Sequence, residues 1–150
     1  MKRTKLYVWC AFAAWCLWLL WMLIFSRLDT PSPMSLEEYA RGHLVVKPLR
    51  TVTKQIALAV RGDLHAISNL GGNTLLFLPV GLAMPALMPG LRRFFRFLPA
   101  FAGAIVIVEL AQLFLRVGVC EVDDLLLNCA GAAVGFFLWK RRFGKENGAC

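Results

Sequence analysis

Long uncharged, apolar segments constrain this chain more than any other feature of its sequence. Residues 6–26 contain no charged side chain, and residues 64–91 contain none when His65 is neutral. About 18 or more consecutive apolar residues can cross the hydrocarbon core of a bilayer as a helix. Hydrophobic residues make up 59% of the chain and charged residues 17%, whereas soluble domains have about 45–50% and about 25%. This composition argues against a water-soluble enzyme, a disordered tail and a disulfide scaffold.

The apolar segments predict an all-α, polytopic membrane protein with four transmembrane helices, at about residues 6–25, 70–88, 97–115 and 124–139. The fourth is short for a bilayer core of roughly 30 Å, so we expect Asp123 and Asp124 to lie at the membrane edge and to be held by protein partners. The organisation that follows is an anchor helix (1–25), an extracytoplasmic loop with short helices (26–63), a three-helix transmembrane core (64–139) and a basic cytoplasmic tail (140–150).

The net charge of +8 reflects membrane topology rather than a nucleic-acid partner. Basic residues gather beside the predicted spans, where cytoplasmic loops carry Lys and Arg: Lys2, Arg3 and Lys5, then Arg92, Arg93 and Arg96, then Lys140, Arg141, Arg142 and Lys145. We therefore expect a multi-pass protein of the cell membrane with both termini in the cytoplasm. The five cysteines lack metal-binding spacing, so no metal and no cofactor is expected, and the roles of Cys120 and Cys150 stay open.

The loop before the second span contains signals for two short helices. Ser35 and Glu38 have the spacing of a capping box, and a second helix is expected after Pro48. In that helix the apolar residues Val52, Ile56 and Val60 share one face. The opposite face carries three candidates for binding lipid headgroups: Arg50, Lys54 and Arg61. This pattern fits an amphipathic helix in the membrane interface, and equally a solvated helix packed on the bundle.

Polar side chains inside the spans are the main candidates for a site. Glu109, Gln112 and Arg116 share one stripe of the third span, and Asp124 and Asn128 share one stripe of the fourth. With the amino terminus inside, polar groups on three helices lie at matched depth below the outer surface. We therefore predict an outward polar pocket whose members are Asn73, Glu109, Gln112, Arg116, Asp123, Asp124 and Asn128.

Energetics give this pocket two interpretations. A charge inside a span costs roughly 2.5–3.5 kcal/mol on insertion scales, so Glu109 should face protein, and such carboxylates usually mark function. Polar side chains can also simply join helices, at about 0.6–2 kcal/mol for each hydrogen bond. We favour joining for Asn69 and Gln112 taken singly, and a site for Glu109, Asp124 and Asn128 together. Gly131-x-x-x-Gly135 predicts close helix packing.

These residues together resemble the VanZ-like family of integral membrane proteins. The resemblance covers about residues 64–139 and rests on Asn69-Leu-Gly-Gly-Asn73, Phe77-Leu-Pro-Val-Gly81, Glu109-Leu-Ala-Gln112 and Val122-Asp-Asp-Leu-Leu-Leu-Asn128-Cys-Ala-Gly131. In the acidic segment this chain departs from the family pattern, with Gly118 where Arg is common and Glu121 for the first Asp. The resemblance implies a bacterial membrane protein, associated in its namesake with antibiotic resistance to teicoplanin-type glycopeptides, and it implies no reaction.

Three functions compete. The first is a noncatalytic membrane protein that changes how lipophilic glycopeptides or lipid-linked cell-wall precursors sit at the outer surface, with membrane lipids as partners and an undetermined oligomeric state. The second is an enzyme acting on a lipid-linked substrate, with Glu109 and Asp124 as an acid–base pair or as metal ligands. The third is a small proton-coupled exporter driven by one intramembrane carboxylate. We adopt the first, because no Ser/His or Cys/His pair shares a face and the first span has no Glu.

Overall fold

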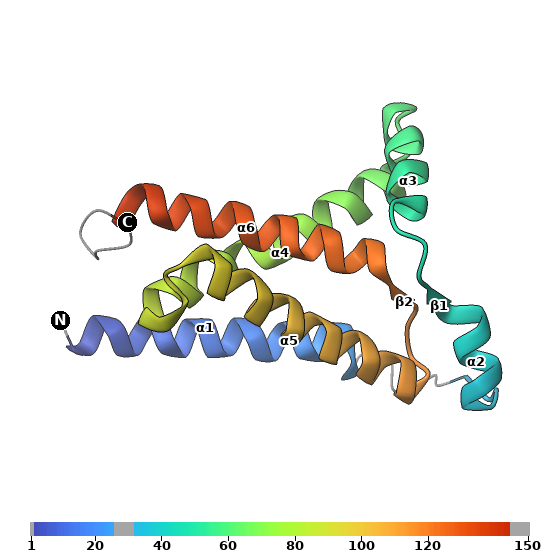
Figure 1. The fold of residues 1–150 in the computed structure, drawn as a ribbon, viewed down its shortest axis with the longest axis horizontal. Coiled ribbons are helices and arrows are strands. Elements are labelled where there is room, and N and C mark those ends of the chain that lie inside the picture. The colour runs from blue at the N-terminus through green and yellow to red at the C-terminus, as the bar shows by residue number, and fades with distance from the viewer. Residues whose placement is uncertain (1, 26–31, 145–150) are drawn as a thin grey trace.

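The computed structural model of the chain describes residues 2–25 and 32–144 and is built almost entirely of helices (Figure 1). Four long helices form a bundle, with two short helices and a two-stranded parallel pair at one end of it. In chain order the elements are α1 (Lys2–Leu23), α2 (Leu36–His43), β1 (Leu44–Val45), α3 (Arg50–Val60), α4 (Leu64–Leu87), the 3-10 helix η2 (Pro89–Leu91), α5 (Phe94–Leu115), β2 (Cys120–Glu121) and α6 (Val122–Phe143).

The expected all-α, polytopic membrane fold is confirmed. Within the described residues, four helical segments are long and apolar enough to cross a membrane: Leu6–Leu23, Leu64–Leu87, Phe94–Leu115 and Val122–Phe143. These segments agree with the four predicted spans, but the last three differ from the prediction at their ends.

Two helix ends differ for identifiable reasons. α4 begins at Leu64 rather than near residue 70, because the Asp63 side chain accepts hydrogen bonds from the backbone N–H groups of His65 and Ala66 and so caps the helix. α6 is not short: it has 22 residues, about 33 Å at 1.5 Å per residue. It continues through the basic residues Lys140–Arg142, so this part of the predicted tail is helical, whereas Lys145 and Cys150 lie outside the described residues.

Helices α4 and α6 pack backbone against backbone. A Cβ atom added at Gly131 would lie 1.9 Å from the carbonyl oxygen of Thr74, and one at Gly135 would lie 2.2 Å from that of Leu78. Gly81 on α4 is equally close to the α6 backbone. The close packing predicted from the Gly-x-x-x-Gly motif is therefore confirmed, because only residues without a side chain permit this approach.

Aromatic side chains fill the bundle away from α2 and α3, and α1 packs on its outside. The stacked rings of Phe97 on α5 and Phe136 on α6 are 4.9 Å apart, and neither side chain is exposed. The Trp15 indole on α1 donates a hydrogen bond to the carbonyl oxygen of Leu76 on α4, at 3.2 Å. The bundle thus has an apolar, aromatic half that holds the four helices together.

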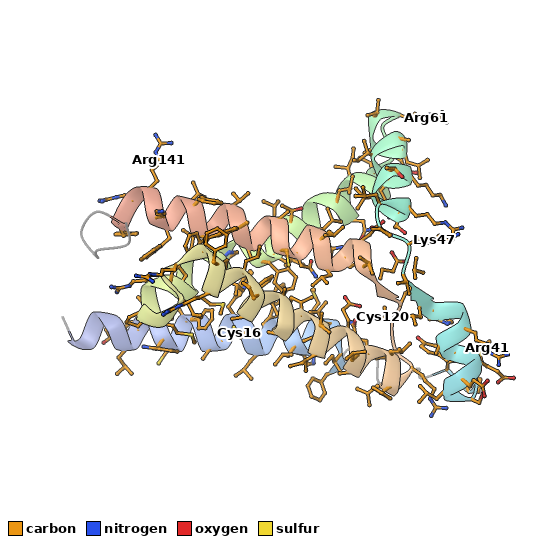
Figure 2. The ribbon with its side chains drawn as sticks, viewed as in Figure 1. Cys16, Arg41, Lys47, Arg61, Cys120 and Arg141 are labelled. Atoms are coloured by element: carbon orange, nitrogen blue, oxygen red, sulfur yellow. The ribbon has the colours of Figure 1, made fainter. Side chains whose placement is uncertain are left out.

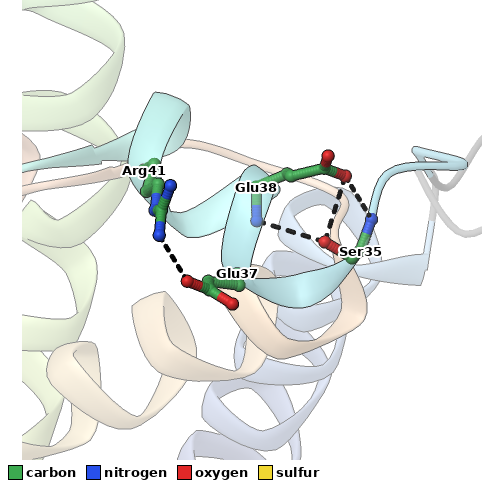
Figure 3. A network of polar contacts seen from close by, with 4 residues as sticks. All are labelled: Ser35, Glu37, Glu38 and Arg41. Carbon is green, nitrogen blue, oxygen red and sulfur yellow. Dashed lines mark hydrogen bonds and ion pairs between the residues drawn. The ribbon is translucent and has the colours of Figure 1, made fainter.

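The predicted capping box starts α2 (Figure 3). The Ser35 hydroxyl accepts a hydrogen bond from the backbone N–H of Glu38, and the Glu38 carboxylate accepts one from the backbone N–H of Ser35. The buried Tyr39 on this helix donates its hydroxyl hydrogen to the carbonyl oxygen of Gly118, at 2.7 Å. This bond ties α2 to the connection between α5 and α6.

Two further features shape the same end of the bundle. Strand β1 pairs in parallel with β2, with Leu44 opposite Cys120 and Val45 opposite Glu121, a pairing that the sequence did not predict. The predicted helix after Pro48 is present as α3, which lies across the long axis of the bundle (Figure 1).

Helix α3 contacts the bundle with a different face from the predicted apolar one. Its Thr51, Gln55 and Leu58 side chains are half-buried, whereas Ile56 and Val60 are 49% and 83% exposed. α3 therefore packs on the bundle through polar residues and Leu58, and it leaves most of its apolar face uncovered.

The α4–α6 contact predicts a sharp contrast between two glycine substitutions. Gly131→Ala should lower the thermal stability of the purified protein strongly, because its Cβ meets backbone atoms and overpacking costs about 1–3 kcal/mol even where side chains can yield. Gly103→Ala on α5, where a Cβ meets nothing within 4 Å, is the matched control and should melt like the parent protein. Equal melting temperatures for the two variants would contradict this packing.

Candidate functional site: a polar chamber between α3 and the bundle

A polar chamber of about 270 Å³ lies between α3, α4, α5 and α6. It is bounded by five of the seven side chains predicted for the pocket, from three spans: Asn73, Glu109, Gln112, Asp124 and Asn128. Sequence reasoning thus located most of the chamber wall.

The side of the chamber formed by α4 and α6 continues their glycine contact. The Asn73 side-chain amide on α4 donates a hydrogen bond to the Asp124 carboxylate on α6, at 3.1 Å. Asn128, one helical turn further along α6, is 5% exposed, and its Oδ1 atom accepts no hydrogen bond from the described residues. A buried amide oxygen of this kind is uncommon and costs about 1–3 kcal/mol when it has no donor.

The α5 side of the chamber carries two buried polar residues. Glu109 is 8% exposed and Gln112 is 5% exposed. The Gln112 amide donates a hydrogen bond to the carbonyl oxygen of Leu23 at the end of α1, at 2.8 Å. Gln112 therefore joins two helices, as we favoured for it singly, while it also forms part of the chamber wall.

Asp123 lies next to Asp124 in sequence but does not reach the chamber. Its carboxylate is 2% exposed and accepts hydrogen bonds from the backbone N–H groups of Leu49, Thr51 and Val52, at 2.5, 2.6 and 2.9 Å. These N–H groups form the first turn of α3, where a carboxylate also meets the positive end of the helix dipole. Asp123 thus holds α3 against α6 instead of facing a ligand.

Arg116 also lies outside the chamber. It ends α5 in the left-handed conformation, with φ 57°, and its guanidinium donates a hydrogen bond to the carbonyl oxygen of Met34 at 2.7 Å. Arg116 does not continue the stripe of Glu109 and Gln112, because α5 ends at Leu115. Arg116 therefore positions the segment that leads to α2.

A second and larger cavity, of about 650 Å³, adjoins the chamber beside α3. Two of the three headgroup candidates, Arg50 and Lys54, line it, while Arg61 lies at the far end of α3 and does not (Figure 2). The two cavities share four lining residues: Thr51, Gln55, Asn69 and Glu121. We call this larger space the basic vestibule, because among the described residues Arg50 and Lys54 are the only Lys or Arg side chains that line either cavity; the carboxylates of Asp63 and Glu121 line it as well.

Sequence reasoning missed Glu121, Thr51 and Gln55. Glu121 escaped because only polar residues inside spans were weighed, although the family's acidic segment marked its position. Thr51 and Gln55 escaped because the helix was analysed by its apolar and cationic faces only. Thr51 and Gln55 face the bundle because the Asp123 carboxylate fixes the position of the first turn of α3.

Two observations bear on reactive chemistry near the chamber. Burial, and after it the Glu109 carboxylate, raise the pKa of the Cys120 thiol above its usual value. A raised pKa keeps the thiol protonated and unreactive at neutral pH. In residues 2–25 and 32–144, no three His, Cys, Asp or Glu side chains come together in a group that could hold a metal ion.

Comparison with known proteins places the whole bundle in one family. The sequence profile of the VanZ/LLP1 family matches residues 12–143. Comparison with the curated proteins found no match, and neither did comparison with the solved structures. The matched range extends well beyond the resemblance noted from sequence motifs, since it includes the second half of α1 and both short helices.

The Asp123 contact predicts that α3 depends on one side chain. Asp123→Ala leaves the N–H groups of the first turn without their acceptor, so hydrogen–deuterium exchange across residues 50–60 should rise at least about fivefold, as expected for a loss of about 1–3 kcal/mol. Glu37→Ala, which removes only an exposed ion pair with Arg41, is the control. Unchanged exchange in α3 would show that Asp123 does not hold this helix.

Cys120 predicts a pH-dependent signal that reports the charge of Glu109. Glu109→Gln removes one cause of the raised thiol pKa, so the midpoint of Cys120 alkylation by maleimide should move to lower pH. The assay uses a background in which the other four cysteines are replaced, with Glu37→Gln as the control for a remote carboxylate. An unmoved midpoint would mean that Glu109 carries no charge in this range.

Proposed function

Because the chain belongs to the VanZ/LLP1 family, we propose that it is a noncatalytic protein of the cell membrane that binds the polar headgroup of a lipid-tailed molecule in the polar chamber. The class of ligand that we propose is a lipophilic glycopeptide of the teicoplanin type or a lipid-linked cell-wall precursor. Binding would change how such molecules sit at the outer membrane surface. The observation that carries the proposal is a chamber of buried polar side chains from three apolar helices.

The charge distribution supports an orientation with the chamber facing outward. α1 begins and α6 ends at one end of the bundle, and the turn between α4 and α5 lies at that same end (Figure 1). Arg92 and Arg93 lie in that turn, and Arg141 lies near the end of α6 (Figure 2). Short loops rich in Lys and Arg face the cytoplasm, so this orientation puts α2, α3 and the chamber outside.

The position of α3 supports contact with the membrane surface. This helix lies across the long axis of the bundle (Figure 1). When the four long helices cross the membrane, α3 is therefore roughly parallel to the membrane plane. Ile56 and Val60 are exposed on it, and an amphipathic helix with an uncovered apolar face inserts that face among lipids. In that position Arg50 and Lys54 would lie near lipid phosphates, to which guanidinium and ammonium groups donate charge-assisted hydrogen bonds.

The chamber itself supports ligand binding more than helix joining. Joining needs one partner for each polar group, as Gln112 has in the Leu23 carbonyl oxygen. Asn128 has no such partner for its oxygen among the described residues, and the space of about 270 Å³ beside it is lined mainly by polar side chains. A headgroup that donates a hydrogen bond to the Asn128 oxygen would offset the free-energy cost of burying that oxygen without a donor.

The proposed function predicts loss of protection by chamber variants that still fold. In cells protected from teicoplanin by this protein, Asn128→Ala and Glu109→Gln should lower the inhibitory concentration to that of cells without the protein, because the first removes an amide acceptor from the chamber and the second removes a carboxylate. A glycopeptide without a lipid chain should show no such difference.

Glu37→Gln, remote from the chamber, is the control and should protect like the parent. Immunoblots of the membrane fraction must show equal amounts of each variant. Full protection by both chamber variants at equal abundance would refute the proposed site.

A further inference from the structure

The two connected cavities differ in charge. The basic vestibule is lined by Arg50 and Lys54 together with the carboxylates of Asp63 and Glu121, and the Asp63 carboxylate is engaged as the cap of α4. None of the described residues that line the chamber is basic, and three of them are carboxylates, Glu109, Glu121 and Asp124. A ligand that fills both spaces therefore meets cations first and hydrogen-bond acceptors behind them. A purely anionic headgroup matches only the first of these surroundings.

Glu121 is the residue at which these spaces meet. It lines the vestibule, the chamber and a third recess of about 180 Å³ between α5 and α6. The register of β2 with β1, which pairs Glu121 with Val45, fixes it there. A group passing from Arg50 and Lys54 into the chamber therefore passes this carboxylate.

The back of the chamber also calls for a donor. Asn128 is 5% exposed, and its Oδ1 atom accepts no hydrogen bond from the described residues. An amide oxygen beside carboxylates is satisfied by an N–H or O–H donor and not by phosphate oxygens, which only accept. This observation is independent of the acidic residues and points to the same ligand chemistry.

The third recess is apolar and suits a hydrocarbon chain. Its wall includes Val106, Leu110 and Leu125, and Val106 and Leu110 are 39% and 43% exposed on the outside of the bundle, where lipid surrounds a transmembrane helix. The recess shares Glu109 and Glu121 with the chamber. A headgroup in the chamber could thus keep its tail in the bilayer.

Given the proposed headgroup-binding function, on which this step rests, we propose that the chamber also binds an aminophospholipid of the surrounding membrane, whose headgroup joins a phosphate to a primary ammonium. Arg50 and Lys54 bind the phosphate, because guanidinium and ammonium groups form charge-assisted bonds to phosphate oxygens. The primary ammonium enters the chamber and donates to Glu121, Asp124 and the Asn128 amide oxygen. An acyl chain runs along the recess between α5 and α6.

The test is a titration of the purified full-length protein in detergent with three short-chain lipids: dioctanoyl phosphatidylethanolamine, phosphatidylglycerol and phosphatidylcholine. The melting temperature is the readout. Phosphatidylethanolamine should bind about tenfold tighter than the other two lipids. Phosphatidylglycerol lacks the ammonium, and the quaternary ammonium of phosphatidylcholine has no N–H donor. One charge-assisted hydrogen bond contributes at least a factor of about ten in affinity.

Two variants separate the phosphate contact from the ammonium contact. Glu121→Gln should remove the preference for phosphatidylethanolamine while phosphatidylglycerol still binds, and Arg50→Gln combined with Lys54→Gln should weaken both lipids. Arg61→Gln, on the same helix but outside the vestibule, should change neither. For each variant the shift is measured from the melting temperature of that same variant without lipid. The comparison of the three lipids on the parent protein tests the proposal even if a variant does not fold.

The outcomes separate this inference from the proposed function. If phosphatidylglycerol binds the parent protein as tightly as phosphatidylethanolamine, or if Glu121→Gln keeps the preference, the aminophospholipid assignment is overturned and headgroup binding stands. If no lipid shifts the melting temperature of the parent, the aminophospholipid assignment is overturned, and the proposed function is then decided by the teicoplanin protection assay alone.

Discussion

The close approach of α4 to α6 is the constraint on which the rest of this structure depends. Gly81, Gly131 and Gly135 let the two backbones come within van der Waals contact, and this contact sets the register of the residues one and two turns further on. Asn73 therefore meets Asp124, and Asn128 lies at the back of the chamber. A side chain at any of the three glycines would separate the helices and open the chamber wall.

The second constraint is the use of Asp123 to hold α3. A carboxylate buried at a membrane edge needs several donors, and the free N–H groups of a helix N-terminus provide them. Because this anion is already part of the protein, the N-terminus of α3 is not available to a ligand anion. Arg50 and Lys54 provide that attraction instead, from the side of the helix that faces the vestibule.

Much of this arrangement could be predicted from sequence, and the part that could not depends on long-range contacts. Counting turns along α4, α5 and α6 brought Asn73, Gln112 and Asn128 to one depth and Glu109 one turn deeper, and all four line the chamber. It could not separate Asp123 from Asp124, since adjacent helical residues point roughly 100° apart and only the position of α3 shows which one faces the chamber. Nor could it find Glu121, whose place depends on pairing with Val45, far away in sequence. The length of α6 was misjudged because charged residues were taken to bound it: the helix begins two residues earlier, where Asp123 is hydrogen-bonded to α3, and it continues through the basic residues 140–142.

The central claim, that the polar chamber opens outward, is tested most directly by the sidedness of a cysteine placed in its wall. In a background without native cysteines, Gln55→Cys lies where chamber and vestibule join, and Gly90→Cys lies exposed at the opposite end of the bundle. A membrane-impermeant thiol reagent added to intact cells should modify Gln55→Cys, and it should reach Gly90→Cys only after the membrane is opened. The reverse pattern, or a Gln55→Cys thiol that reacts from neither side, would contradict the account.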